Sequence, residues 1–374
     1  MEISDCENGQ KFSKFCAQIL KITIFFEKEA GIALQIMTRN NGQRKPLAIT
    51  KGEITMNLYK KLKGALLVTS ILAGSNAYAA DIVIGVPNWP SVNATAHILQ
   101  TAIEQNLGFE VELQNGSNPI IFEAMDASSM HVHPEVWLPN QQNLHDKYVV
   151  EKGTVSINHA GVEAFQGMCV DQATADKHGI ASIGDLTNPD IAALFDEDDD
   201  GQGDLWIGAP GWASTNVEKI RAKSYGYDQT MSLSEIDETV AYADLDNAIK
   251  AGDAWAGFCY APHYVFALHD LQILEEPPHD PATWDVTQPT DDPDWLEISK
   301  AGSAWSPAQL HIGYAKGLEK SHPGVARLLA NTSFTTDDVS AFTFALVIDK
   351  IEPSEFAKTW VAENEDRVLG WLAE

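Results

Sequence analysis

Four large aromatic side chains stand where a ring can face a cleft. Each lies beside a proline or glycine, at a predicted strand end or loop; they are Trp89, Trp137, Trp212 and Tyr260. Rings brought together from distant segments form a cage for a soft cation with no N–H to donate, and each ring contributes about 0.5–2 kcal/mol. The alternative is that these rings belong to the core. Their position beside turn residues favours the cage.

Glu135 is the charged residue next to one of these rings. It precedes Trp137 by two residues, so strand alternation puts both side chains on the same face. An ionised Glu135 would repel a ligand carboxylate and would suit a ligand whose polar atom is a basic oxygen, with which it could share a proton in a short hydrogen bond. The alternative is that Glu135 faces solvent or caps a loop.

An acidic loop precedes Trp212 along the chain. Residues 196–204 match the early positions of a calcium-binding loop, with Gly201 at the sharp turn, although position 12 is Ile207 rather than an acid. The pattern predicts a structural Ca²⁺ ion, and the alternative is a solvated acidic turn. The candidate ligands are Asp196, Asp198, Asp200, Gln202 and Asp204.

The first 79 residues are expected to lie outside the mature protein. Residues 56–79 have a basic start, an apolar run and an Ala-x-Ala end, which together predict a cleavable signal peptide. The residue directly after the cleavage site, Ala80, is not a cysteine, so we expect no lipid anchor. Residues 1–55 show no organisation of their own and are interpreted as a non-native or extra N-terminal segment.

The charge balance restricts the partners. The chain has 53 acidic and 25 basic residues and a formal net charge of −28, which argues against nucleic acid and anionic membranes. Cys169 and Cys259 lie in apolar runs and are expected to be two buried free thiols, with one disulfide as the alternative in an oxidising compartment.

The hydrophobic periodicity predicts an α/β fold. Strand, helix and strand patterns alternate from Asp81 to Trp137, which indicates a parallel sheet. A strand is expected at 165–171, a helix at 216–225, a helix at 232–245 and a helical tail after residue 325.

These residues resemble a known family. Trp137-Leu-Pro, Pro210-Gly-Trp212, the acidic loop and Tyr260-Ala-Pro occur in the order found in periplasmic binding proteins of ABC importers for glycine betaine, choline and related methylated amines. The resemblance runs from Ala80 to the C-terminus. It implies a two-lobe clamshell with two hinge crossings and the ligand between the lobes: lobe 1 is residues 80–165 plus 306–374, and lobe 2 is residues 166–305.

The resemblance also implies roles for individual residues. Trp137, Trp212 and Tyr260 would form the cage, and Trp89 would match an extra cage position of choline-binding relatives. The acid that those relatives carry two residues later is Ser91 here, which weakens choline as the ligand. Backbone N–H groups of Ala213 and Ser214 would hold a betaine carboxylate. Phe165 and Trp305, near the lobe crossings, are expected to complete or brace the cage.

The resulting expectation is a periplasmic, monomeric solute-binding component of an ABC importer, not an enzyme, which delivers its ligand to permease and ATPase subunits. Trimethylamine N-oxide is the first ligand because of Glu135, and glycine betaine is the alternative. A periplasmic enzyme acting on such amines is the remote alternative, and catalysis would show as turnover of the amine.

Overall fold

The computed structural model describes residues 22–23, 35–40, 43–47 and 80–373. The chain divides into two units, Met1–Tyr78 and Ala79–Glu374. In the first unit, three strands form an antiparallel sheet: β1 (Ile22–Thr23), β2 (Gln35–Asn40) and β3 (Gln43–Leu47). The sequence patterns predicted no element there. The predicted signal peptide at 56–79 lies outside the described residues.

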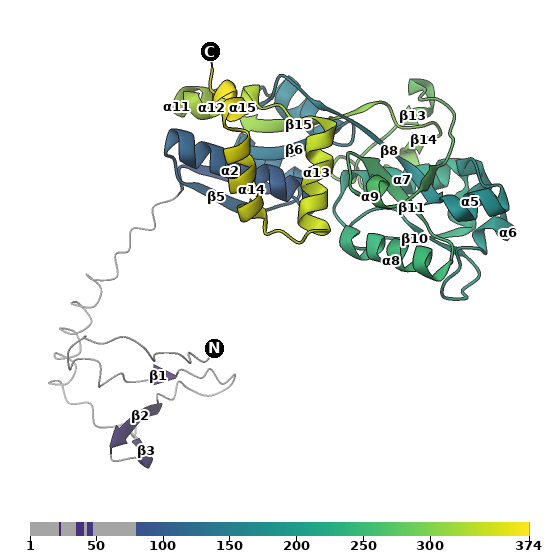
Figure 1. Cartoon of the computed structure of the whole chain (residues 1–374), viewed down its shortest axis with the longest axis horizontal. Helices are drawn as coiled ribbons and strands as arrows, with labels where there is room; N and C mark the ends of the chain where they lie inside the picture. Colours follow the sequence, from purple (N-terminus) through teal and green to yellow (C-terminus); the bar gives the residue numbers. More distant parts are fainter. Residues whose placement is uncertain (1–21, 24–34, 41–42, 48–79, 374) are drawn as a thin grey trace. The chain divides into compact units, whose positions relative to one another are not determined.

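The second unit is built on a mixed ten-stranded sheet (Figure 1). Its main order is β10-β9-β11-β8-β15-β6-β4-β5, with β12 paired to β8 and β7 paired to β15. The strands are β4 (Ile82–Val86), β5 (Val111–Asn115), β6 (Val132–Leu138), β7 (Val155–Ile157), β8 (Val162–Asp171), β9 (Gly203–Trp206), β10 (Met231–Ser234), β11 (Ala256–Ala261), β12 (Leu271–Ile273) and β15 (Ala308–Ala315).

Two strands join the two halves of this sheet. β4 is parallel to β5 and β6, as the alternating pattern predicted, and β9 is parallel to β10 and β11. β8 and β15, in contrast, pair antiparallel with their neighbours. β8 pairs with β15 through residues 162–164 and with β11 through residues 165–170. The change of partner therefore falls next to the predicted lobe boundary, although the lobe bounds themselves stay a prediction.

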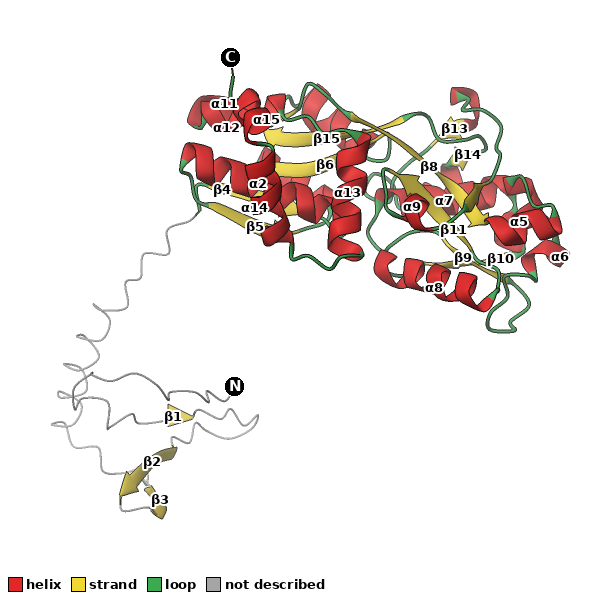
Figure 2. Ribbon diagram, viewed as in Figure 1, coloured by secondary structure: helices red, strands yellow, loops and turns green. Residues whose placement is uncertain are grey.

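Helices cover the sheet in both halves (Figure 2). They are α2 (Pro90–Leu107), α3 (Asn118–Asp126), α4 (Gln142–His145), α5 (Gln172–His178), α6 (Pro189–Ala192), α7 (Ala213–Tyr225), α8 (Glu238–Ala251), α9 (Val265–Leu268), α10 (Trp295–Ile298), α11 (Leu318–Ser321), α12 (Pro323–Asn331), α13 (Thr336–Val347), α14 (Pro353–Glu363) and α15 (Glu365–Trp371). A π-helical segment, Asp146–Glu151, follows α4, and β13 (Trp284–Asp285) pairs with β14 (Lys300–Ala301).

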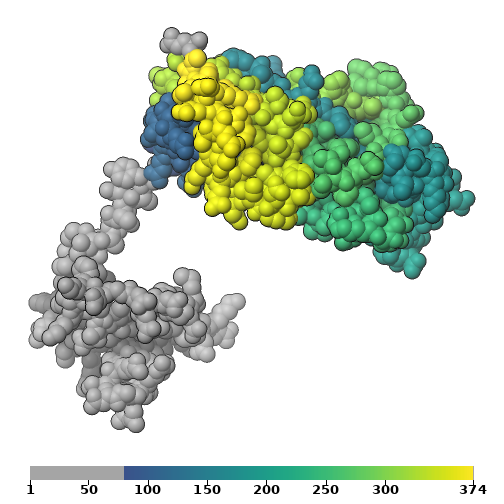
Figure 3. Space-filling model, viewed as in Figure 1, coloured from purple at the N-terminus to yellow at the C-terminus, as the bar shows by residue number. Residues whose placement is uncertain are grey.

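The C-terminal helices pack on the same half of the unit as its first strands and helices. α13 and α14 both pack on α2, although they lie near the opposite end of the unit in sequence. In the space-filling view, the yellow C-terminal helices lie against the blue part of the unit (Figure 3). The predicted helical tail is confirmed, and it makes this half discontinuous in sequence.

Local chemistry explains where the helices that carry the site begin and end. α2 begins at Pro90, whose missing N–H costs nothing in the first turn, and ends at Gly108 with a left-handed φ of 71°. The helix predicted at 232–245 is wrong in its first part. Residues 231–234 form β10 because they pair parallel with β9, and α8 starts only after Asp237, whose side chain accepts the N–H of Thr239.

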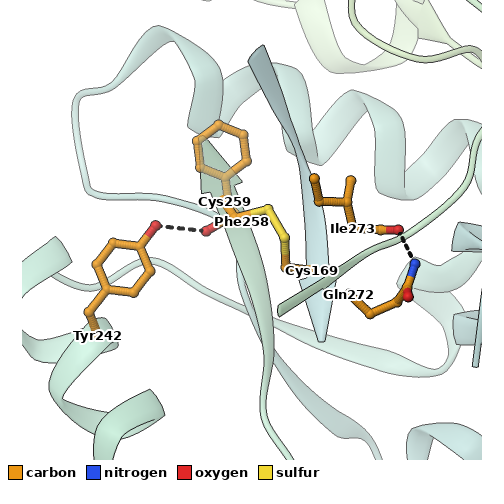
Figure 4. The surroundings of a disulfide bond; sticks show 6 residues. All are labelled: Cys169, Tyr242, Phe258, Cys259, Gln272 and Ile273. Carbon is orange, nitrogen blue, oxygen red and sulfur yellow. Dashed lines mark hydrogen bonds between the residues drawn. A yellow bond between two sulfur atoms is a disulfide. The ribbon is translucent and has the colours of Figure 1, made fainter. Parts of the chain in front are cut away.

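Cys169 and Cys259 form a disulfide, so the expectation of two free thiols is wrong (Figure 4). They lie on the adjacent antiparallel strands β8 and β11, with their Cα atoms 5.9 Å apart. This separation is within the range that a disulfide spans. Both side chains are fully buried. The cross-link thus fixes β11, the strand that carries Tyr260, to the strand that joins the two halves.

Within the part of the chain that the structure describes, no helix is both long enough and apolar enough to cross a membrane.

Candidate functional site

A small cavity contains the predicted aromatic cage. It is lined by Trp89, Asn118, Trp137, Asn140, Gln141, Gln166, Trp212, Ala213, Ser214, Phe258 and Tyr260. All four rings singled out from the sequence line it, together with both predicted backbone donors. Every lining residue is uncharged.

The four rings come from four different elements and meet at steep angles. Trp89 precedes α2, Trp137 is on β6, Trp212 precedes α7 and Tyr260 is on β11. The ring centroids of Trp137 and Tyr260 are 5.3 Å apart with planes at 89°, and those of Trp89 and Trp212 are 6.2 Å apart at 88°. Trp212 and Tyr260 stand at 5.9 Å and 81°. Nearly perpendicular rings form the walls of a box, which suits a roughly spherical group.

The polar atoms of three cage rings are occupied by the protein. Trp89 Nε1 donates to Glu135 Oε2 at 2.6 Å, Trp212 Nε1 donates to the Asn88 carbonyl oxygen at 3.0 Å, and the Tyr260 hydroxyl donates to Glu238 Oε1. These bonds hold the orientation of each ring. They also leave the rings to contact a ligand through their carbon surfaces.

Glu135 does not line the cavity, contrary to the expectation of direct ligand contact. Its oxygens accept hydrogen bonds from Trp89, from Ser91 Oγ at 2.8 Å and from Thr95 Oγ1 at 2.8 Å. The Trp89 ring, which the alternation rule cannot place, accounts for this, because it stands between Glu135 and the cavity. Burial raises the pKa of the Glu135 carboxyl to about 7, while the three donors oppose the rise.

We expect Glu135 to make stability depend on pH. Its pKa is raised from 4.5 to about 7, so the folded protein keeps a proton that the unfolded chain releases in this range. Its contribution is fully present below pH 4.5 and is lost as the pH rises through about 7. Glutamine does not titrate, so Glu135→Gln should not lose stability in this way. The difference in free energy of unfolding, variant minus wild type, should therefore increase by about 3 kcal/mol as the pH rises from 4.5 to above 7.

Denaturant titrations on both sides of this pH range measure the effect, with Glu112→Gln as an exposed control on β5. A difference between Glu135→Gln and wild type that does not change with pH would contradict the assignment.

The N-terminus of α7 opens into the cavity. The first N–H groups of a helix have no intrahelical partner, and the residue before α7, Trp212, supplies no side-chain cap. Ala213 and Ser214 are therefore placed to donate backbone N–H groups to a ligand oxygen, and the helix dipole favours negative charge there.

The sequence reasoning missed the neutral polar part of the lining. Asn140 and Gln166 exchange hydrogen bonds of 2.5 and 2.8 Å, and the buried side-chain oxygen of Gln141 has no partner among the described residues. Phe258 could have been found, because it precedes Tyr260 by two residues on the same strand. The amides carry no comparable signal in the sequence.

Phe165 and Trp305 do not line the cavity. Phe165 packs on Phe266 with ring centroids 5.5 Å apart. Trp305 Nε1 donates to the buried Glu218 at 2.7 Å, and Glu218 is ion-paired with the buried Arg221. Trp305 therefore fastens the segment before β15 to α7 rather than completing the cage.

Three of the five predicted calcium ligands come together. Carboxylate oxygens of Asp196, Asp198 and Asp204 lie within 4.8 Å of one another, which fits one Ca²⁺ ion. Asp200 is not in this group, and its carboxylate accepts the backbone N–H of Gln202 at 2.8 Å. Calcium binding at this loop stays a prediction.

Comparison with known proteins decides the family. Residues 80–363 match the family model described as the substrate-binding domain of the ABC-type glycine betaine transport system. The chain belongs to this family. The glycine betaine/proline betaine-binding periplasmic protein of Salmonella typhimurium is 23% identical over 259 residues, covering 63% of this chain and 73% of the relative. The trimethylamine N-oxide-binding protein of Pelagibacter ubique is 23% identical over 318 residues, covering 81% and 96%.

Solved structures agree with the family's two-lobe fold. Lactococcal OpuAC, in its closed-liganded conformation with glycine betaine, superposes with a TM-score of 0.59 at 21% identity, covering 78% of this chain and 99% of that one. An ABC-transporter choline-binding protein in complex with choline gives a TM-score of 0.62 at 19% identity, covering 78% and 91%. The predicted α/β, two-lobe binding-protein fold is confirmed.

Proposed function

We propose that this chain is the periplasmic, monomeric solute-binding component of an ABC importer. It captures a small methylated amine, with trimethylamine N-oxide as its first ligand, and hands it unchanged to a membrane permease driven by an ATPase. The box of four rings around an uncharged cavity carries this proposal. Membership of a substrate-binding family supports binding rather than catalysis.

The lining selects the ligand class. Quaternary ammonium methyl groups fill an aromatic box and gain cation–π energy from each wall. Every lining residue is uncharged, so a ligand with net charge would be buried without a partner ion. A neutral zwitterion avoids this cost. Trimethylamine N-oxide and glycine betaine meet the condition, whereas choline has a net charge that would touch no ion in the lining.

Buried carboxylates favour the N-oxide over the betaine. Glu135 and Glu238 each accept a hydrogen bond from a cage ring, but the pKa of Glu135 is raised to about 7, so the negative charge assigned here is that of Glu238, behind Tyr260. This charge attracts the ammonium centre of a ligand and repels the carboxylate that glycine betaine carries in addition. The relatives include both an N-oxide-binding and a betaine-binding protein at 23% identity, so the choice rests on the site.

Glycine betaine is the second candidate because of α7. The free N–H groups of Ala213 and Ser214 at the start of this 13-residue helix suit a carboxylate. Calorimetric titration of the purified protein with both ligands in parallel tests the proposal. Tight binding of the N-oxide alone supports the first ligand, tight binding of betaine alone assigns the carboxylate to α7, and binding of neither refutes the function.

We expect Asn88 to slow ligand release. Its carbonyl oxygen accepts Trp212 Nε1, and its side-chain Nδ2 donates to Asp237 Oδ2 at 3.1 Å, so the β4–α2 loop is bonded to the starts of both α7 and α8. Asn88→Ala removes the second bond. The dissociation rate should rise by about three- to tenfold with an unchanged association rate.

Stopped-flow tryptophan fluorescence measures both rates, and Asn115→Ala, an exposed asparagine on β5, is the control. An unchanged dissociation rate in Asn88→Ala would refute the role of this loop.

A further inference from the structure

Glu238 is a buried carboxylate one ring away from the ligand cavity. It is the first residue of α8, its side chain is buried, and its Oε1 accepts the hydrogen of the Tyr260 hydroxyl. Tyr260 itself lines the cavity. Glu238 is not in that lining, so it acts on the cavity across the Tyr260 ring rather than by contact.

The surroundings of Glu238 leave its charge largely uncompensated by cations. Within residues 80–373, no lysine or arginine pairs with it, and its Oε2 has no hydrogen-bond partner. His263 Nε2 lies 2.9 Å from Oε1. The other ring nitrogen of His263 accepts the N–H of Val265 at 3.2 Å, so Nε2 carries the hydrogen and the ring is neutral, and Nε2 makes no hydrogen bond to the carboxylate despite this short distance.

This arrangement makes the cage wall more negative. A phenol that donates to a carboxylate has greater electron density in its ring, and a charge in a dry interior acts over several ångströms. Glu135 likewise accepts a hydrogen bond from Trp89, although its raised pKa of about 7 means that it holds a proton for part of the time near neutral pH. The two carboxylates also interact with each other, since Glu238 contributes to the raised pKa of Glu135.

We propose that Glu238 is a specificity-determining residue: across the Tyr260 ring, it supplies the counter-charge to the ligand's ammonium centre and so selects a cation over an uncharged group of the same shape. This inference rests on the proposed function. It accounts for the recognition of charge by a cavity lined with uncharged residues, because the compensating carboxylate of Glu238 stands outside the lining.

Glu238→Gln separates charge from shape. Glutamine keeps an oxygen that accepts the Tyr260 hydroxyl, so the ring stays in place. Each ligand is paired with its carbon isostere: trimethylamine N-oxide with tert-butanol, and glycine betaine with 3,3-dimethylbutanoate. Using the pair whose amine the wild type binds, we expect the variant to bind the amine about tenfold more weakly, as a charge several ångströms away at intermediate dielectric implies. Affinity for neutral tert-butanol should be unchanged, and affinity for 3,3-dimethylbutanoate, an anion without an ammonium centre, should stay the same or rise.

Two control variants separate the charge of Glu238 from its position and from general surface charge. Asp244→Asn removes an exposed charge from the same helix and should leave both affinities unchanged. Glu238→Asp, which keeps the charge, should restore discrimination. Melting temperatures check the fold, and Glu238→Met replaces the glutamine variant if that one does not fold.

If Glu238→Gln lost affinity for the amine and for its isostere equally, Glu238 would only position the Tyr260 ring. If it lost no affinity for the amine, Glu238 would not supply a counter-charge. Both outcomes overturn the inference and leave the function standing, whereas a wild type that binds neither amine refutes the function itself.

Discussion

Replacing Trp212 by alanine is expected to abolish ligand binding while the protein stays folded. The Trp212 ring is the wall that both Trp89 and Tyr260 meet at right angles, and its Nε1 fastens the Asn88 loop. Its removal deletes a cation–π contact, apolar surface and the bond that closes the box. Together these predict an affinity loss of at least about a hundredfold.

Calorimetry and thermal unfolding of the same preparations test this expectation. Trp295→Ala is the matched control, since Trp295 is half-buried in α10 and does not line the cavity. It should bind as wild type does. Affinity of Trp212→Ala close to that of wild type would eliminate the aromatic box as the binding site.

The second large effect is expected from the disulfide. Cys169 and Cys259 are 90 residues apart in sequence, so their bond restricts a long loop of the unfolded chain. Replacing both by alanine should lower the free energy of unfolding by about 2–5 kcal/mol. Guanidinium titration measures the change. The wild type unfolded in the presence of a reductant should shift by a similar amount, and an unchanged midpoint in both experiments would contradict a stabilising bond.

This bond also bears on ligand binding. Cys259 lies between Phe258 and Tyr260, both of which line the cavity, and the Phe258 carbonyl oxygen accepts the Tyr242 hydroxyl at 3.3 Å (Figure 4). Loss of the cross-link therefore releases the strand that positions one cage wall. We expect affinity to fall in the double variant as well as stability.

The aromatic part of the site could be predicted from the sequence because its signal is local. A large ring beside a proline or glycine, as at Trp137 and Trp212, indicates a strand end or loop where the side chain can face a cleft. Strand alternation likewise put Glu135 on the face of Trp137, but it could not show that the ring of Trp89, 46 residues earlier, would come between that carboxylate and the cavity.

Other features depend on pairings between distant segments. The bond between Cys169 and Cys259 requires β8 and β11 to be neighbours, and the periodicity of each strand says nothing of its partner. Residues 231–234 form β10 because β9 is available to pair with them. Glu238 looks like an ordinary acid in the first turn of a helix, and only the fold shows that it accepts a hydrogen bond from Tyr260.

The partner change along β8 has a mechanical consequence. Its first residues are bonded to β15 and the rest to β11, so one continuous ribbon of sheet links the two halves of the molecule. Such a ribbon can twist without breaking its ladder, whereas a sliding motion would break hydrogen bonds. We therefore expect the two halves to move relative to each other by twisting of this ribbon rather than by sliding of its strands.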